Sequence, residues 1–157
     1  MDIPGKEQRP EMRVDGPHQE LTYAIIGCAM RVHNALGPGL KEIHYHRALS
    51  TELEKARLTY EEEKPVHIEI NGSFAGLLYI DHLVEDQVIV EEKALSHLLT
   101  DEEAAQVITY LAATGRRVGL LVNFGRSRLG YRRILPPKKL DEWQDRIRRY
   151  LWNPPRP

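Results

Sequence analysis

Apolar positions along the chain follow the helical period first and the strand period afterwards. Over residues 20–36 they recur on one face of a predicted amphipathic helix, which ends at Gly37-Pro38-Gly39 because these residues terminate helices. A second helix is predicted over about residues 41–56. The apolar face of the first helix comprises Leu21, Ile25, Cys28, Val32 and Leu36.

From residue 66 the period becomes two, which is typical of half-buried strands. Asn71-Gly72 is a strong signal for a hairpin turn, since a type I′ turn needs positive φ at both central residues. Glu85-Asp86 is a second predicted tight turn. The three strands of this antiparallel meander are predicted at residues 66–70, 74–84 and 87–93.

The second half of the chain alternates between helix and strand patterns. A helix is predicted from Thr100, which has capping-box spacing to Glu103, as far as Gly115. Strands at 118–124 and 130–135 and a terminal helix at 140–152 follow. The order α-α-β-β-β-α-β-β-α predicts one α/β domain, with a mixed central sheet of about four to five strands flanked by helices.

Composition bounds the class of protein without naming a function. The 157 residues suit one domain, residues 1–17 read as a polar tail, and no apolar run reaches the ~18 residues of a membrane-spanning helix. The N-terminus lacks the apolar segment of a secretory signal. The single cysteine, Cys28, excludes an internal disulfide and is expected to be buried, so we expect a cytoplasmic protein that does not bind membranes.

Charge is distributed unevenly although the net charge is only −1. Residues 116–149 contain eleven Lys and Arg against three Asp and Glu, whereas acids gather at 61–63 and 91–103. A basic region opposite an acidic cluster suits a metal-dependent enzyme acting on a phosphate backbone. A solvated charged tail explains the same pattern without any function.

The stretch Tyr79–Leu95 places three charges inside predicted strands. Side chains alternate faces along a strand, so Glu91 and Lys93 share a face, and the hairpin at Glu85-Asp86 brings Asp81 near them. Two carboxylates this close suit Mg²⁺, and an adjacent lysine can orient a water or stabilise charge on a phosphate. The alternative is a salt bridge of Lys93 with either carboxylate on an exposed face.

Two helical pairs add further candidates. Glu42 and Tyr45 lie three residues apart in the second helix, and Gln106 and Tyr110 lie four apart in the third. Taken separately, each is explained by an ordinary hydrogen-bonding pair on a helix surface.

Four motifs together resemble the PD-(D/E)XK nuclease superfamily, and specifically its small GxxExxY family of prokaryotic proteins. The motifs are Gly39-Leu-Lys-Glu42-Ile-His-Tyr45, Tyr79-Ile-Asp81, Val88-Ile-Val-Glu91-Glu-Lys93 and the Gln-x-x-x-Tyr element Gln106–Tyr110 of the RecB-like branch. The resemblance covers about residues 20–135. It implies a restriction-endonuclease-like core at 18–135, whereas residues 136–157 lie outside the resemblance and are predicted from their pattern to be a C-terminal helical extension.

The resemblance also implies roles. Asp81 and Glu91 would hold Mg²⁺ or Mn²⁺, with Glu42 and the backbone carbonyl of Glu92 as further ligands. Lys93 would activate the nucleophilic water. Gln106 and Tyr110 would position the lysine or the scissile phosphate.

Position 92 departs from the family, where it is usually apolar. The Glu92 side chain is expected on the opposite face of its strand, against a helix, where a lone charge is costly. We expect it to pair with Arg116 or Arg117, or to lie on an open face. His46, four residues after Glu42, is expected to be a surface imidazole, with support of Glu42 as the alternative. A metal shared by His44 and His46 is not expected, because the two side chains point to different faces of the helix, and His82 should face away from Asp81.

These features predict a metal-dependent nuclease that hydrolyses phosphodiester bonds, with DNA favoured over RNA as the substrate. A non-cleaving subunit of the same fold within a larger nucleic-acid complex is the alternative. A homo-oligomer or a protein partner bound through the C-terminal helix is also plausible, since a chain of this length has little room for a separate DNA-recognition domain.

Overall fold

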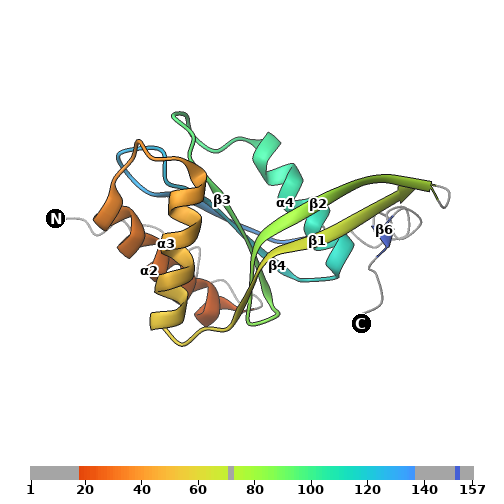
Figure 1. The fold of residues 1–157 in the computed structure, drawn as a ribbon, viewed down its shortest axis with the longest axis horizontal. Helices are drawn as coiled ribbons and strands as arrows, with labels where there is room; N and C mark the ends of the chain where they lie inside the picture. Colours follow the sequence, from red (N-terminus) through yellow and green to blue (C-terminus); the bar gives the residue numbers. More distant parts are fainter. Residues whose placement is uncertain (1–17, 71–72, 137–150, 153–157) are drawn as a thin grey trace.

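The computed structural model describes residues 18–70, 73–136 and 151–152. Three helices and six strands follow one another in the described part of the chain (Figure 1). The helices are α2 (Gln19–Leu36), α3 (Glu42–Lys55) and α4 (Asp101–Thr114). The strands are β1 (Tyr60–Ile70), β2 (Ser73–Val84), β3 (Val88–Lys93), β4 (Val118–Asn123), β5 (Gly130–Ile134) and β6 (Leu151–Trp152).

The strands form one mixed sheet in the order β5-β4-β3-β2-β1-β6. Strands β3 and β4 are parallel, and the other neighbours are antiparallel. A parallel pair needs a crossover connection, which α4 provides between β3 and β4. The predicted α/β fold, with its mixed sheet and its order of elements, is confirmed.

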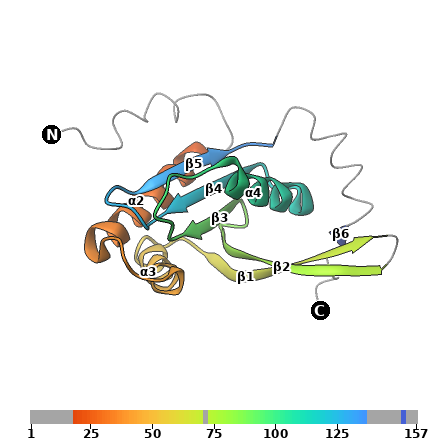
Figure 2. The same ribbon diagram turned by 90° about the horizontal axis from the view of Figure 1, so that it is seen from above.

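Helices cover both faces of the sheet (Figure 2). One core packs α2 and α3 against Val88 and Val90 of β3, and the other packs α4 against Ile89 of the same strand. Strand β4 divides its side chains in the same way. Both central strands are therefore buried on both sides, as their continuous apolar runs predict.

The turn between β2 and β3 sets the register of the hairpin. Glu85 and Asp86 have φ values of 53° and 55°, as a type I′ turn requires. His82 then pairs with Val90. The Asn71-Gly72 turn lies outside the described residues, although Ile70 and Ser73 on either side of it are paired.

Strand β1 begins at Tyr60 rather than at the predicted Val66. Its first residues pair through the backbone with the end of β2, Tyr60 with Val84 and Glu61 with Leu83. Exposed acidic side chains hide this pairing from a hydrophobic pattern, because backbone hydrogen bonds do not depend on the side chains.

The loop between α2 and α3 is held by one tyrosine. The Tyr45 hydroxyl donates to the Gly37 carbonyl at 2.6 Å and accepts from the Leu40 amide at 3.1 Å. Its ring stacks on Phe124 with centroids 4.8 Å apart. Gly39 has φ 105°, a conformation that favours glycine, so it allows the sharp turn of the chain into the second helix.

The predicted terminal helix at 140–152 differs from the structure at its last two residues. Leu151 and Trp152 form β6, which pairs with Ile68 and His67 of β1. The edge of β1 offers unpaired backbone groups, which favour a strand there over a helix. The rest of this predicted helix, and the predicted tail at 1–17, lie outside the described residues.

Two expectations from composition concern Cys28 and membranes. Cys28 is free and fully buried, as predicted. Among the described helices, none combines the length and apolar character needed to cross a bilayer.

Gly125 should be irreplaceable because it lies against the backbone that follows β3. A Cβ built on it would be 2.4 Å from the Leu95 carbonyl oxygen and 2.5 Å from the Leu95 amide nitrogen. We expect Gly125→Ala to lower the free energy of unfolding by about 1–3 kcal/mol in urea denaturation. Gly76→Ala is the matched control, because nothing lies within 4 Å of its Cβ position. Equal stability of the two variants would contradict this packing.

Candidate active site

Asp81 of β2 and Glu91 of β3 come together just beyond the last residue pair of the β2–β3 ladder. The Asp81 amide donates to Glu91 Oε1 at 3.1 Å, and the Glu92 amide donates to Asp81 Oδ2 at 2.8 Å. Each carboxylate thus accepts a hydrogen bond from the backbone of the neighbouring strand. The hairpin register set by the Glu85-Asp86 turn produces this proximity.

Burial makes this carboxylate pair costly to ionise. Burial, and next the charge of Glu92, raise the pKa of Asp81 to about 7. Burial, and next the charge of Asp81, raise the pKa of Glu91 to about 9. Two such groups ionise together only if a cation compensates them, and carboxylate oxygens are the ligands that Mg²⁺ and Mn²⁺ prefer. The donor set therefore fits a divalent ion.

Lys93 lies at the start of a chain of hydrogen bonds that ends on β2. Its Nζ donates to Gln106 Oε1 at 3.0 Å, and Gln106 Nε2 donates to the Tyr110 hydroxyl at 3.0 Å. That hydroxyl donates to the Tyr79 carbonyl at 3.0 Å. Burial, and next the charge of Glu91, raise the pKa of Tyr110 to about 12, so the hydroxyl keeps its proton.

These hydrogen bonds contradict the interpretation of Lys93 as one half of a salt bridge with Asp81 or Glu91. Among the described residues, no carboxylate lies within ion-pair distance of its ammonium group. Only 2% of Glu91 is exposed, so this residue does not lie on an exposed face. The lysine is held by a neutral amide instead, which leaves its charge available to the site.

Glu42 lies in the first turn of α3 with an exposed side chain. Its charge contributes to the raised pKa of Asp81, which puts the two carboxylates within electrostatic reach. The suggested hydrogen-bonding pair with Tyr45 is wrong, because the Tyr45 hydroxyl bonds to Gly37 and Leu40. The role of Glu42 as a metal ligand stays a prediction.

Glu92 faces the other side of β3, as predicted, but its expected partners are wrong. Arg116 binds Asp86 at 2.6 Å, and Glu92 instead contacts His46 Nδ1 at 3.0 Å and His82 Nδ1 at 2.6 Å. His46 is consequently not a surface imidazole, since only 12% of its side chain is exposed. His82 faces away from Asp81, as expected. The Glu92 carboxylate does not join the Asp81–Glu91 pair, and use of its backbone carbonyl stays a prediction.

Asn123, at the end of β4, is a structural residue that the sequence analysis missed. Its Oδ1 accepts from the Leu95 amide at 2.8 Å, and its Nδ2 donates to the His97 carbonyl at 3.0 Å. It thereby fixes the segment that follows Lys93. A polar residue at the end of an otherwise apolar buried run was the available signal.

The comparisons with known proteins agree with this geometry. A family model described as the PD-(D/E)XK nuclease superfamily matches residues 19–134, which is most of the chain. The chain belongs to this superfamily. Searches of curated proteins and of solved structures find no significant match.

Membership of the PD-(D/E)XK superfamily supports a nuclease-type enzyme in general, and nucleases of this superfamily use divalent metals. The matched region includes every residue of the Asp81–Glu91 pair and of the Lys93–Gln106–Tyr110 chain. The superfamily therefore gives a chemical reason for charges in a central strand.

The raised pKa of Asp81 predicts how stability depends on pH in a chelator. The folded state keeps a proton up to about pH 7 that the unfolded chain releases near its ordinary pKa of 3.8. This contribution is complete at pH below ~4 and is lost as the pH rises towards about 7. The free energy of unfolding of the wild type should therefore fall between pH 5 and pH 8.

Asp81→Asn removes this contribution together with the part of the raised pKa of Glu91 and of His46 that the Asp81 charge causes, and all three act in the same direction. Urea denaturation with EDTA should show a smaller fall for the variant, by about 1–3 kcal/mol, since a pKa difference of one corresponds to about 1.4 kcal/mol. An equal fall in the free energy of unfolding for the two proteins would contradict the inference that Asp81 is buried and protonated.

Proposed function

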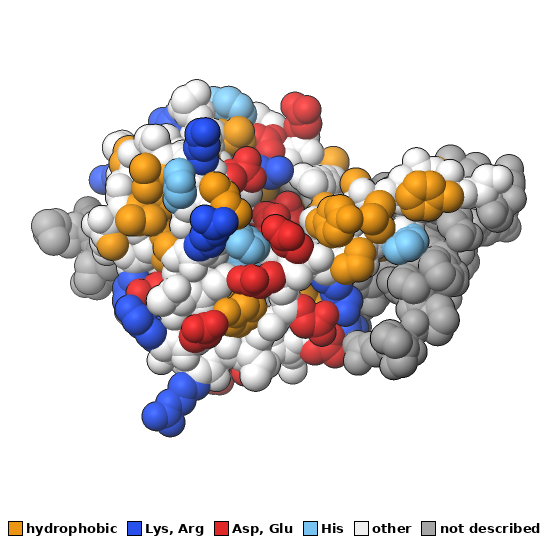
Figure 3. Space-filling view, viewed as in Figure 1, with side chains coloured by type: hydrophobic (Ala, Val, Ile, Leu, Met, Phe, Trp, Pro, Cys, Tyr) orange, Lys and Arg blue, Asp and Glu red, His pale blue; other side chains and the backbone are white. Residues whose placement is uncertain are grey.

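We propose that the protein is a Mg²⁺- or Mn²⁺-dependent nuclease that hydrolyses phosphodiester bonds in DNA. The observation that carries this proposal is the Asp81–Glu91 pair beside an amide-anchored Lys93. Acidic side chains also gather on the molecular face between α3 and the β1–β2 hairpin (Figure 3). The four motifs favour the GxxExxY family within the superfamily, and we propose that the enzyme acts in the cytoplasm of a prokaryote.

Asp81 and Glu91 would hold the ion, with Glu42 and the Glu92 carbonyl as further oxygen ligands. A bound divalent ion supplies charge to polarise the phosphate and lowers the pKa of the attacking water. Lys93 would orient that water or stabilise negative charge developing on the phosphate. Gln106 and Tyr110 are positioning residues, because they fix the ammonium group through the hydrogen bonds described above.

The uneven charge of the chain supports a nucleic-acid substrate. Eleven Lys and Arg lie between residues 116 and 149, and such a basic region neutralises phosphates along a backbone. The near-neutral net charge argues against indiscriminate binding, so contacts near the scissile phosphate would dominate recognition.

Cleavage of DNA tests the proposal directly. Purified full-length protein should cut single- or double-stranded DNA with Mg²⁺ or Mn²⁺ and stop in EDTA. Asp81→Asn and Lys93→Met should each lower turnover about a hundredfold or more, because the first loses an anionic ligand and the second the positioned charge. The matched controls are Asp86→Asn on the same hairpin and Lys55→Met, whose side chain is 69% exposed.

Cleavage that survives both substitutions in correctly folded protein would overturn the assignment of these residues. Metal-dependent binding of DNA without cleavage, by wild-type protein and by both variants, would favour a non-cleaving subunit instead. RNA of matched sequence, assayed alongside, reports which nucleic acid is the substrate.

Gln106→Leu tests whether Gln106 positions Lys93 without contributing to the binding of substrate. Loss of the amide frees Lys93, so kcat should fall by about tenfold or more while KM changes little. Leu suits a helix, so thermal unfolding should stay close to that of the wild type. Gln87→Leu in the exposed β2–β3 turn is the control and should leave kcat unchanged. An unaltered kcat in Gln106→Leu would contradict the positioning role.

A further inference from the structure

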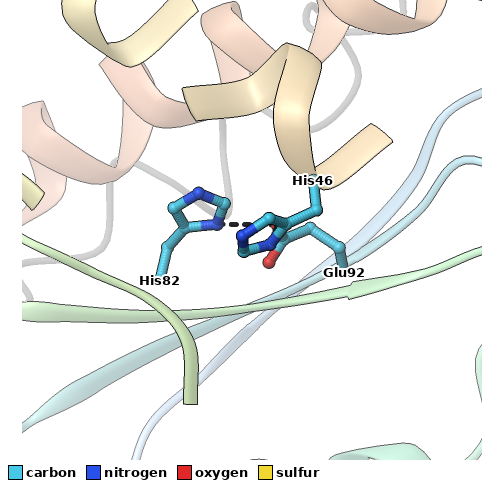
Figure 4. Close-up of side chains that lie close together, drawn as sticks. All are labelled: His46, His82 and Glu92. Atoms are coloured by element: carbon cyan, nitrogen blue, oxygen red, sulfur yellow. Dashed lines mark hydrogen bonds and ion pairs between the residues drawn. The ribbon is translucent and has the colours of Figure 1, made fainter. Parts of the chain in front are cut away.

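A second cluster of candidate ligands lies on the opposite face of β3. His46 of α3, His82 of β2 and Glu92 of β3 point towards one another (Figure 4). One ligand atom from each residue lies within 4.8 Å of the others. The two imidazole rings are stacked with centroids 4.2 Å apart. Both Nδ1 atoms lie close to the same carboxylate oxygen, Oε1 of Glu92.

This cluster is almost completely removed from water. The side chains of His82 and Glu92 are 0% and 1% exposed, and that of His46 is 12% exposed. Among the described residues, Glu92 Oε2 has no hydrogen-bond partner, and His82 Nδ1 lies close to Glu92 Oε1 without the alignment of a hydrogen bond. Buried polar atoms left in this way are costly, so they indicate that something binds between them.

The hydrogen bonding on the far side of His82 shows which of its ring nitrogens faces Glu92. Ser50 Oγ lies 2.8 Å from His82 Nε2 and also contacts the Glu62 carboxylate. The single hydroxyl proton of Ser50 goes to an oxygen, either the Glu62 carboxylate or the His46 carbonyl at 3.2 Å, so His82 Nε2 is assigned as the donor to Ser50 Oγ. His82 Nδ1 lies on the other side of the ring, 2.6 Å from Glu92 Oε1, and two such acceptor atoms are held this close only by a proton or a metal ion between them.

We propose that His46 Nδ1, His82 Nδ1 and the Glu92 carboxylate bind a transition-metal ion of the Zn²⁺ type. Two imidazoles and one carboxylate form a zinc donor set that leaves a fourth position for water. Zinc–ligand bonds of about 2.0–2.2 Å in a tetrahedron put neighbouring ligand atoms about 3.3 Å apart. The present separations of 2.6 and 3.0 Å need only a small opening to reach that value.

The outer contacts fit the same proposal. Histidines that bind metal through one ring nitrogen usually donate from the other to an oxygen. Here Ser50 Oγ lies 2.8 Å from His82 Nε2, and Glu62 Oε1 lies 3.8 Å from His46 Nε2. The Glu62 side chain is 44% exposed, so the outer edge of the cluster is close to solvent and an ion has a short path inwards.

This site is chemically distinct from the Asp81–Glu91 pair and does not depend on nuclease activity. Imidazole nitrogens favour Zn²⁺ over Mg²⁺, whereas an all-oxygen site favours Mg²⁺ or Mn²⁺. An ion held by His46, His82 and Glu92 would cross-link α3 to β2 and β3. It would thus brace, from behind, the strands that carry Asp81 and Glu91.

Metal titration of the full chain tests the proposal in an Asp81→Asn background, which disables the opposite site. Calorimetry should show one equivalent of Zn²⁺ bound, unaffected by excess Mg²⁺, and saturating Zn²⁺ should raise the melting temperature. Co²⁺ in place of Zn²⁺ should give the visible absorption bands of a four-coordinate ion with nitrogen ligands.

His46→Gln and Glu92→Gln, each added to that background, should weaken Zn²⁺ binding about tenfold or more and abolish the Co²⁺ bands. His46 is partly exposed on a helix, so its variant should fold even if the Glu92 variant does not. His97→Gln, on an exposed loop, controls for adventitious binding to histidine.

Absence of Zn²⁺ binding in the Asp81→Asn protein would overturn the site, as would equal affinity in the folded His46→Gln variant and the His97→Gln control. Either result would identify the cluster as a buried imidazolium–carboxylate pair. Nuclease activity is not a readout here, so failure of the proposed function would leave the binding result intact.

Discussion

Two consecutive glutamates in a strand buried on both faces are the constraint on which the structure depends. Glu91 and Glu92 are 2% and 1% exposed, and their side chains leave β3 in opposite directions. A buried carboxylate is stable only when protonated, paired or bound to a cation. The chain therefore has to supply two separate solutions, one on each side of a single strand.

The two solutions use different chemistry. On the α4 face, Glu91 is placed beside a second acid, Asp81, and the pKa values of both rise. On the α3 face, Glu92 is placed between His46 and His82, and although burial pushes its pKa upwards, these imidazoles hold it below its usual range. One face is thus short of positive charge and the other is supplied with ionisable nitrogen. An ion that prefers oxygen ligands suits the first face, and an ion that prefers nitrogen ligands suits the second.

Much of the fold was predictable because the signals were local. The Glu85-Asp86 turn, the strand alternation and the Thr100 and Gly115 helix ends are each encoded within a few residues, and the turn and the alternation alone place Asp81 opposite Glu91. Of the two partners of Glu92, His82 lies on the paired strand and on the same predicted face, but His46 was not predictable in this way. His46 is far from Glu92 in the sequence and reaches it only through the packing of α3, so the expected pairing with Arg116 or Arg117 was wrong.

Register links the two faces more tightly than either contact alone. Side chains along a strand alternate with a period of two, so a slip of β3 by one residue would exchange Glu91 and Glu92 between faces. Both carboxylates would then lose their partners at once, and Lys93 would leave Gln106. The β2–β3 turn fixes the register on one edge of β3, and pairing of Glu91 with Leu121 and of Glu92 with Val122 fixes it on the other. The alternation of side chains that brings Asp81, Glu91 and Lys93 together on one face of the sheet therefore also places Glu92 beside His46 and His82 on the opposite face.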